Sequence, residues 1–407
     1  MDNKRLIYLD NASTTPTDPR VVEAMVPYFT THFGNAASRN HPFGWAAEEG
    51  VDYAREQIAK LIGAEDKEII FTSGATESIN LALKGAFEMY AKKGNHFITA
   101  KTEHKAVLDT CKHIEKMGGE VTYLDVKYDA MIDLAELEAA IRPTTVMVCI
   151  MYANNETGVI QPMKEIGQVC EKHGVLLMSD ITQAAGKIPV DVKALGIHVA
   201  AFTAHKMYGP KGIGALFVNR IKPRVKVTAQ IDGGGHERGM RSGTLNVTGI
   251  VGFGKAAELA MAEMEQDAAR LSKLRDKLQT AFMERMEEVT INGNINSRLP
   301  QITNMSFKHV EGEGLMMTFN QNIALSSGSA CTSASLEPSY VLVAMGLGDD
   351  LAHSSLRFSL GRFTTEDDVD YTIEAITKGV NHMRDLSPIW EMFKEGVDLS
   401  KVEWSEH

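Results

Sequence analysis

The chain has 407 residues, of which 44% are hydrophobic and 23% are charged, and its formal net charge at pH 7 is -11. A chain of this length is too long for a single small hydrophobic core, and it is long enough for a large domain with a smaller one appended. The composition excludes a disordered or fibrous protein. The acidic balance argues against a nucleic-acid groove, so we expect a small-molecule substrate and no direct nucleic-acid binding.

The first residues contain no signal sequence, and no stretch approaches the ~18 apolar residues that a membrane span needs. We therefore expect a cytoplasmic protein with no membrane association and no cleaved leader. In chain order, short apolar runs alternate with helical patterns from about residue 68 to 218, which is typical of a parallel sheet with crossover helices.

The expected strands of this region are Glu68–Phe71, His96–Ala100, Val121–Leu124, Thr145–Met151, Val175–Ser179, Val199–Thr203 and Ile213–Val218. The expected helices are Ile79–Phe87, Ala106–Met117, Leu134–Ile141 and Met163–His173. The pattern predicts one large α/β domain whose mainly parallel sheet is sandwiched by helices.

The pattern changes after Gly254, where Lys255–Glu288 alternates small and apolar residues with charged ones at the helical period. We interpret this segment as the connection between two domains. Strands are then expected at Ile302–Phe307, Ile323–Ser326 and Leu356–Leu360, and a covering helix at Glu366–Met383. A small α+β domain therefore closes the chain.

Polar residues follow several expected strands at the edge where ligands bind to open parallel sheets. The segment Thr72–Ser78 leaves a strand and opens a helix, so its amides and the Thr76 hydroxyl would face a phosphate at a helix N-terminus. A plain N-cap explains the same residues. No Gly-Lys-Ser/Thr follows, so this is not the nucleotide P-loop.

Two ionisable residues end neighbouring strands of the same expected sheet. Asp180 follows an apolar run, where a carboxylate needs a cationic partner such as a protonated pyridine nitrogen, although an ordinary strand-end cap is the alternative. Lys206 follows Val199–Thr203, where a partly desolvated amine favours imine formation, although a single lysine there is usually a snorkelling surface residue. Their combination with a phosphate-type helix start predicts pyridoxal phosphate held as a Schiff base on Lys206.

Three further residues could contact such a cofactor or its substrate. His104 follows a strand, where an imidazole could lie over a flat ring and handle protons, or be structural. Asn155 also follows a strand and could donate to a phenolate or a carboxylate, or form a turn. Arg357 lies in an apolar strand pattern, where a buried arginine needs an anion. This anion would be either a substrate carboxylate or an internal salt-bridge partner.

The four cysteines, Cys111, Cys149, Cys170 and Cys331, are widely spaced and include no C-x-x-C pair. This spacing predicts neither a disulfide framework nor a zinc site, and it fits a reducing compartment. The first three lie in apolar patterns and are interpreted as core residues. Cys331 differs, because it lies within Ser326–Ser335, a run of small polar residues from which a thiol could react.

With these residues in place, the chain resembles the group I cysteine desulfurases of the IscS/NifS type, within the fold type I, aspartate aminotransferase-like pyridoxal phosphate enzymes. The resemblance covers nearly the whole chain. Its motifs are Tyr8–Pro16, Thr72–Ser78, Asn154–Gly158, His205–Lys206 with Tyr208–Gly212, Gly233–Glu237 with Arg241–Thr244, and the loop around Cys331.

The resemblance implies an enzyme that converts L-cysteine to L-alanine. Lys206 would take the α-proton, and the Cys331 thiolate would attack the substrate sulfur and hold it as a persulfide. The sulfur would pass to iron-sulfur scaffold proteins and to carriers for tRNA thiolation. No resident metal is implied, although Cys331 could ligate a transient iron-sulfur cluster together with a scaffold partner.

The resemblance also implies roles for individual residues. Lys206, Cys331 and His104 would be the catalytic residues, and Asn155 and Arg357 would bind the substrate carboxylate. The cofactor would be held by Ala75, Thr76, His104, Asn155, Asp180, Gln183, Thr203, His205 and Lys206, joined by Thr244 from the second subunit of an obligate homodimer. Asp180 would pair with the pyridine nitrogen, Gln183 with the ring oxygen, and His104 would stack on the ring. Many relatives carry Ser where this chain has Thr203, which keeps the hydroxyl.

We place the large pyridoxal phosphate-binding domain at residues 15–260 and the small domain at residues 1–14 and 261–407. The small domain would carry the Cys331 loop and the tail Leu399–Trp404, which resembles a scaffold-docking tail. The basic run from Arg220 to Lys226 could meet acidic carriers. A frayed terminus and a solvated surface strand explain the same two segments.

Two other kinds of protein fit parts of this pattern. One is another enzyme on the same fold, such as a selenocysteine lyase, a cysteine sulfinate desulfinase or an aminotransferase, although an aminotransferase has no use for a cysteine loop. The other is a docking subunit that kept the fold and lost the chemistry. Intact Lys206, Asp180, His104 and Cys331 count against that second reading.

Overall fold

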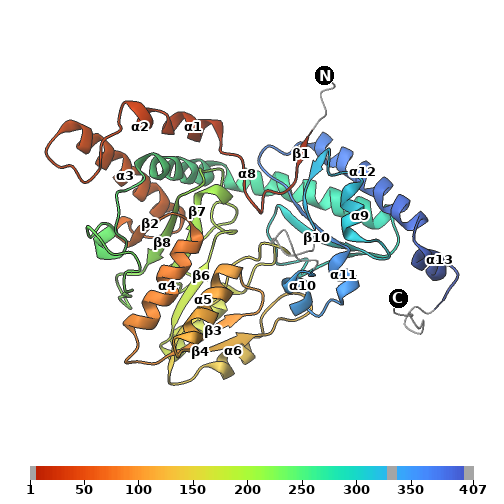
Figure 1. Cartoon of the computed structure of the whole chain (residues 1–407), viewed down its shortest axis with the longest axis horizontal. Coiled ribbons are helices and arrows are strands. Elements are labelled where there is room, and N and C mark those ends of the chain that lie inside the picture. Colours follow the sequence, from red (N-terminus) through yellow and green to blue (C-terminus); the bar gives the residue numbers. More distant parts are fainter. Residues whose placement is uncertain (1–5, 328–336, 398–407) are drawn as a thin grey trace.

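The computed structural model describes residues 6–327 and 337–397. Figure 1 shows two bodies of unequal size that share one long helix, α8 (Val247–Arg285), which runs across the top of the molecule. The larger body lies on the left of the view and is built around a central sheet, and the smaller one lies on the right.

The central sheet has seven strands in the order β2-β8-β7-β6-β5-β3-β4. The strands are β2 (Ile69–Thr72), β3 (His96–Ala100), β4 (Glu120–Leu124), β5 (Thr145–Cys149), β6 (Leu176–Asp180), β7 (Val199–Thr203) and β8 (Gly214–Val218). Only β8 is antiparallel to both of its neighbours, because a tight turn after β7 returns the chain directly to it. The expectation of a mainly parallel sheet flanked by helices is confirmed.

Both faces of this sheet are buried under helices, which explains why its strands read as continuous apolar runs. In β7, Phe202 faces a core shared with α3 (Pro42–Leu61), α7 (Met163–His173) and α8. The next residue toward the N-terminus, Ala201, faces the opposite core with α4 (Ala75–Met89) and α5 (Lys105–Lys116). Successive side chains of a strand therefore fill separate layers.

The small body contains a four-stranded sheet in the order β12-β13-β10-β9 and a separate two-stranded pair of β1 with β11. Its strands are β1 (Ile7–Tyr8), β9 (Val289–Ile291), β10 (Ile302–Phe307), β11 (Ile323–Ala324), β12 (Ser326–Ser327) and β13 (Ser355–Ser359). The single strand expected at Ile323–Ser326 is therefore two short strands. Leu325 separates β11, which pairs with β1, from β12, which pairs with β13, and its side chain is buried.

The remaining helices are short, apart from one. They are α1 (Pro19–Met25), α2 (Pro27–Thr30), α6 (Leu134–Ala140), α9 (Gly312–Met317), α10 (Tyr340–Ala344), α11 (Asp349–His353), α12 (Glu366–Asp385) and α13 (Pro388–Lys394). The long helix α12 begins with a Thr365–Asp368 capping box and packs Val369, Ile373 and Ile376 into the small core.

The helix expected at Lys255–Glu288 begins eight residues earlier, at Val247. Glycines in its first turns weaken the helical signal of the sequence. They allow close packing instead, because a Cβ on Gly254 would lie 2.5 Å from the Cα of Ala54 in α3. Helix α8 packs in the large core with Ile250–Ala260 and in the small core with Leu271–Phe282. The domain boundary at residue 260 therefore falls inside one continuous helix and stays a prediction.

Across the two described ranges, none of the helices combines the length and the apolarity needed to cross a bilayer.

A buried ion pair ties β2 to the segment that precedes α8. Arg55 of α3 contacts both carboxylate oxygens of Glu237 at 2.8 Å, and the side chains are only 8% and 2% exposed. The backbone N–H of Phe71 donates to the same carboxylate at 2.7 Å. Removal of one partner would leave an uncompensated buried charge.

We expect Glu237→Gln to lower the free energy of unfolding by about 3 kcal/mol, because Arg55 would stay buried without an anion. Urea denaturation measures the change. The matched control is Glu56→Gln, which removes an exposed ion pair with Lys60 on the same helix and is expected to cost less than about 1 kcal/mol. Equal losses in the two variants would contradict the prediction.

Candidate active site

A cavity of about 730 Å³ opens at the carboxyl ends of β2, β3, β5, β6 and β7. This volume suits a cofactor together with a small substrate. The cavity brings together residues that are far apart in the sequence. Its walls include Ala75, Thr76, His104, Asn155, Asp180, Gln183, Thr203, His205, Lys206 and Arg357.

One end of the cavity is a cup of backbone amides at the start of α4. This helix begins at Ala75 and not at Ile79, because its first turn consists of residues with weak helical signal that lie directly after Gly74. The earlier start places the amides of Ala75 and Thr76 in the first turn, where they have no partner within the helix. An anion is favoured at this position by the free N–H groups and by the helix dipole.

The cup depends on a close contact between two glycines. Gly214, at the start of β8, lies directly behind the turn, and a Cβ at this position would be 2.6 Å from the Cα of Gly74. The hydroxyls of Thr72 and Ser78 are 2.7 Å apart and close the turn from inside. The shape of the cup is therefore set by backbone packing against β8.

Lys206 lies in a short 3-10 turn directly after β7 and extends into the cavity. Its Nζ donates to the carbonyl oxygens of Ala12 at 2.6 Å and of Ser13 at 2.5 Å. The surface-lysine reading is therefore wrong, because the amine is partly buried under the N-terminal segment. Burial, together with the charges of Lys206 and Lys211, lowers the pKa of the adjacent His205 to about 4. His205 is therefore neutral at pH 7.

Asp180 ends β6 with only 5% of its surface exposed. Its Oδ1 accepts a hydrogen bond from the Thr182 N–H at 2.9 Å, as a strand-end cap would. Among the described residues, no cationic side chain forms an ion pair with this carboxylate. The cavity therefore offers a buried acid whose cationic partner can only come from a ligand or from the undescribed residues.

His104 has a structural role as well as a place in the cavity wall. It is the N-cap of α5, and its Nδ1 accepts a hydrogen bond from the Ala106 N–H at 3.1 Å. This contact leaves Nε2 as the ring nitrogen that carries the proton in the neutral form. The side-chain amide of Gln183 donates to the carbonyl of Ala12 at 2.9 Å, so it also fixes the N-terminal segment over the cavity.

The donor set fits pyridoxal phosphate. The amide cup suits its phosphate, Asp180 suits a protonated ring nitrogen, and Lys206 suits its aldehyde. Within the described part of the chain, two buried oxygens of the cavity wall have no hydrogen-bond partner, namely Asn155 Oδ1 and Thr182 Oγ1. A polar ligand would satisfy such atoms, which otherwise carry a desolvation cost.

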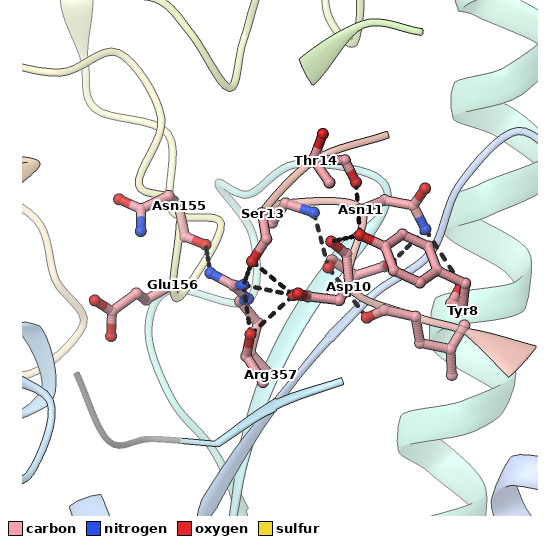
Figure 2. A network of polar contacts seen from close by, with 12 residues as sticks. Tyr8, Asp10, Asn11, Ser13, Thr14, Asn155, Glu156 and Arg357 are labelled. Atoms are coloured by element: carbon pink, nitrogen blue, oxygen red, sulfur yellow. Dashed lines mark hydrogen bonds and ion pairs between the residues drawn. The ribbon is translucent and has the colours of Figure 1, made fainter. Parts of the chain in front are cut away.

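The sequence left two candidate anions for Arg357, an internal salt-bridge partner and a substrate carboxylate, and the position of its side chain allows both. Its Nη2 forms an ion pair with Asp10 Oδ1 at 2.7 Å, and its Nη1 donates to the carbonyl of Asn155 at 2.8 Å, as Figure 2 shows. The side chain is 4% exposed, and it also lines the cavity. The internal salt bridge therefore exists, and the guanidinium remains within reach of a bound ligand.

Several residues of the cavity wall were not assigned roles from the sequence. The largest group is the N-terminal segment Ala12–Thr14, which served only as part of a family motif. Its run of small polar residues directly after an apolar stretch was the available signal in the sequence. Glu103, which precedes His104 in the chain and does not line the cavity, was also overlooked; it is fully buried, and burial followed by the charge of Asp180 raises the pKa of its carboxyl well above the usual range.

One expected site residue lies apart from the rest, and another is outside the part of the chain that the structure describes. Thr244 is exposed and does not line the cavity of its own chain. Cys331 lies outside the described residues. The other three cysteines are buried, as expected, and burial raises the pKa of Cys111 and of Cys170 to about 12.

Comparisons with known proteins agree with this geometry. Residues 7–372 match the family described as Aminotransferase class-V. The chain is 57% identical over 399 residues to a protein named cysteine desulfurase IscS from Anaeromyxobacter dehalogenans, with 98% of each chain covered. It is 58% identical over 403 residues to a protein of the same name from Klebsiella pneumoniae, with 98% of this chain and 99% of that one covered.

Solved structures give the same result. A NifS-like protein superposes with a TM-score of 0.86 at 36% identity, over 93% of this chain and 100% of the other. A structure titled SspA in complex with cysteine superposes with a TM-score of 0.77 at 35% identity, over 88% of this chain and 100% of the other. The likeness therefore extends over both bodies of the molecule.

We expect Gly214→Ala to weaken the binding of pyridoxal phosphate roughly ten- to hundredfold, because the new methyl group would displace Gly74 and the amide cup. Titration of the apoprotein with the cofactor, followed by absorbance, measures the dissociation constant. Gly348→Ala is the matched control, since no atom lies within 4 Å of a Cβ there. Unchanged affinity in a folded Gly214 variant would show that the cup does not bind the phosphate.

Proposed function

The chain belongs to the class-V aminotransferase family, and from this membership and its cavity we propose that it is a pyridoxal phosphate-dependent cysteine desulfurase of the IscS type. It converts L-cysteine to L-alanine and supplies sulfur for iron-sulfur cluster assembly. The observation that carries this proposal is the meeting of Lys206, Asp180 and the amide cup in one cavity, in a chain that matches IscS proteins over its full length.

When bound, the cofactor supplies an aldehyde that condenses with amino groups and a ring that withdraws electrons. Asp180 would hold the proton of the ring nitrogen, and the imidazole of His104 would stack on the ring. Ala75, Thr76, Thr203 and His205 would hold the phosphate, and Gln183 would contact the ring oxygen. These assignments use groups whose positions at the cavity wall are compatible with such a ligand.

Arg357 and Asn155 bind the carboxylate of L-cysteine and orient its Cα toward Lys206. The guanidinium offers a charged group for the carboxylate, and the backbone carbonyl of Asn155 holds its Nη1 at 2.8 Å. Lys206 then removes the proton from Cα with its Nζ, which the Ala12 and Ser13 carbonyls hold in position. A base held in this way needs little reorganisation to act.

Cys331 accepts the sulfur. Its thiolate attacks the sulfur of the substrate, a new S–S bond forms, and the C–S bond of the substrate breaks with its electron pair left on the carbon. The carbon that lost the sulfur takes up a proton, and Cα regains the proton held by Lys206, which gives L-alanine and leaves the sulfur on Cys331 as a persulfide. The buried thiols of Cys111, Cys149 and Cys170 have raised pKa values and are poor nucleophiles, which supports the choice of Cys331.

The enzyme acts as a homodimer in which Thr244 contacts the phosphate in the second subunit's site. An exposed aromatic face supports this arrangement. Phe29, Phe33, Phe43 and Trp45 are each at least 52% exposed, and the rings of Phe33 and Phe43 are 5.3 Å apart. Clustered exposed aromatics of this kind are typical of protein interfaces.

The persulfide sulfur passes to acceptor proteins, among them iron-sulfur scaffolds and tRNA-thiolation carriers. Lys222, Arg224 and Lys226 are exposed beside one another after β8, where acidic carriers would be attracted. The expected docking tail Leu399–Trp404 lies outside the described residues. We place the enzyme in the cytoplasm, because persulfide chemistry at Cys331 needs a reduced thiol.

We expect Cys331→Ser to retain the cofactor while sulfide release from L-cysteine falls by at least about 100-fold, because a hydroxyl cannot accept the sulfur. Paired measurement of alanine and sulfide in the presence of a reductant tests this. Cys170→Ala, which changes a buried thiol of α7, is the control and is expected to retain activity. Full sulfide release by the Cys331 variant would overturn the persulfide step.

The dimer can be tested through its aromatic face. We expect Phe33→Glu combined with Phe43→Glu to give monomers in analytical ultracentrifugation, because two charges would be buried in the interface. Cofactor affinity should fall about tenfold in the same variant, since Thr244 would be lost from the opposite site. Met317→Glu, at a side chain of α9 that is 73% exposed, is the control. A monomer with unchanged cofactor affinity would contradict the role of Thr244.

A further inference from the structure

The arginine assigned to the substrate carboxylate already has a carboxylate bound to it. Asp10 lies just after β1, at the junction of the N-terminal segment with the small body, and its Oδ1 is 2.7 Å from Arg357 Nη2. Figure 2 shows Asp10 and Ser13 on one side of the guanidinium and Asn155 on the other. The substrate therefore meets an arginine that is paired inside the chain.

More acceptors than hydrogens surround the Nη2 atom of Arg357. Besides Asp10, the hydroxyl oxygens of Ser13 and Ser326 lie 2.7 Å and 2.8 Å from this nitrogen, which carries two hydrogens. Both hydroxyls also donate to Asp10 Oδ1, at 2.9 Å and 2.8 Å. Asp10 Oδ1 thus accepts three hydrogen bonds and holds both hydroxyls on the guanidinium.

Each way of binding a carboxylate with two hydrogen bonds requires a hydrogen of Nη2. The end-on fork uses Nη1 and Nη2, and the side-on fork uses Nε and the Nη2 hydrogen beside it. Nη1 already donates to the carbonyl of Asn155. Among the described residues, the buried Nε has no partner. A bidentate substrate must therefore take an Nη2 hydrogen that is now shared by Asp10, Ser13 and Ser326.

Asp10 cannot move far from this position. Its backbone forms a bridge with Ser359 of β13, and the Tyr8 hydroxyl donates to its carbonyl at 3.0 Å. The adjacent Asn11 N–H donates to the Ser359 carbonyl at 3.1 Å. Its carboxylate is consequently held beside the guanidinium, and a second carboxylate would add to it and not replace it.

We infer that Asp10 is a positioning residue that acts through Arg357 and lowers the affinity of the site for carboxylate ligands. This inference rests on the proposed role of Arg357 in substrate binding. Asp10 and its two serines orient the guanidinium, and the negative charge of Asp10 opposes that of the incoming carboxylate. L-cysteine is thereby held loosely enough for the product L-alanine, which carries the same carboxylate, to leave.

The direction in which the affinity for L-alanine changes when Asp10 is replaced distinguishes this role from a purely structural one. Asp10→Asn keeps an oxygen that can accept from Nη2 and removes the charge. We expect the holoenzyme variant to bind L-alanine about fivefold more tightly than the unaltered protein, as followed by the absorbance of the cofactor during titration. L-alaninamide, which lacks the carboxylate, should bind with unchanged affinity. A residue that only supports the fold would weaken both ligands when replaced.

A double-mutant cycle separates this inference from the proposed function. Arg357→Ala alone should weaken L-alanine at least about tenfold, and Asp10→Asn should have no effect in that background. If Arg357→Ala leaves the affinity for L-alanine unchanged, the proposed substrate role of Arg357 is wrong. If Arg357→Ala weakens binding but Asp10→Asn also weakens it or leaves it unchanged, only the inference about Asp10 fails.

Two further variants guard against misfolding and against a nonspecific effect of charge. Ser326→Ala removes one competitor for the Nη2 hydrogens without any change in charge, and we expect about twofold tighter binding of L-alanine. Weaker or unchanged binding in that variant would count against the inference even if Asp10→Asn does not fold. Asp385→Asn, an exposed carboxylate of α12, is the matched control and should leave the L-alanine affinity unaltered.

Discussion

The hydrogen bonds of the N-terminal segment hold the two sides of the cavity together. On one side, the Thr15 N–H donates to the His205 carbonyl at 2.9 Å, and the Tyr208 N–H donates to the Thr15 hydroxyl at 2.8 Å. On the other side, the Ala12 N–H donates to the Ser359 hydroxyl at 2.9 Å. The turn that carries Lys206 and the strand that carries Arg357 are therefore fixed to one short stretch of backbone.

The cavity combines groups that favour opposite charges. The amide cup at the start of α4 favours an anion, and Asp180, at the end of β6, favours a cation. The amine of Lys206 lines the same cavity from the end of β7. A ligand that carries both a phosphate and a basic ring nitrogen is complementary to these groups, and the neutral state of His205 adds no further charge to them.

Packing accounts for features of the site that electrostatics alone would not produce. Gly214 allows β8 to support the cup from behind, and the glycines at the start of α8 allow that helix to approach α3. Burial accounts for Cys111, Cys149 and Cys170, because their thiols are enclosed by the cores of the large body and have raised pKa values. A nucleophilic thiol has to lie outside those cores.

The sequence by itself determined the layered fold and identified Asp180 and Lys206, both of which line the cavity. Apolar runs alternating with helical patterns predicted the parallel sheet, because both of its faces had to be buried. Asp180 and Lys206 could be singled out, since polar residues at the carboxyl ends of parallel strands meet at one edge. The early start of α4 and of α8 was missed, because glycine and small polar residues lower helix propensity while tertiary packing favours the helix.

Only the tertiary structure decided how Arg357 is partnered. Asp10 and Arg357 are separated by 347 positions in the chain, and Ser326 lies 31 positions from Arg357, so no local pattern relates them. Their contact arises because β13 pairs with β12 and the N-terminal segment runs beside it. Local periodicity reports which face of a strand is buried, whereas the partner of a buried charge depends on which distant segments the fold brings to it.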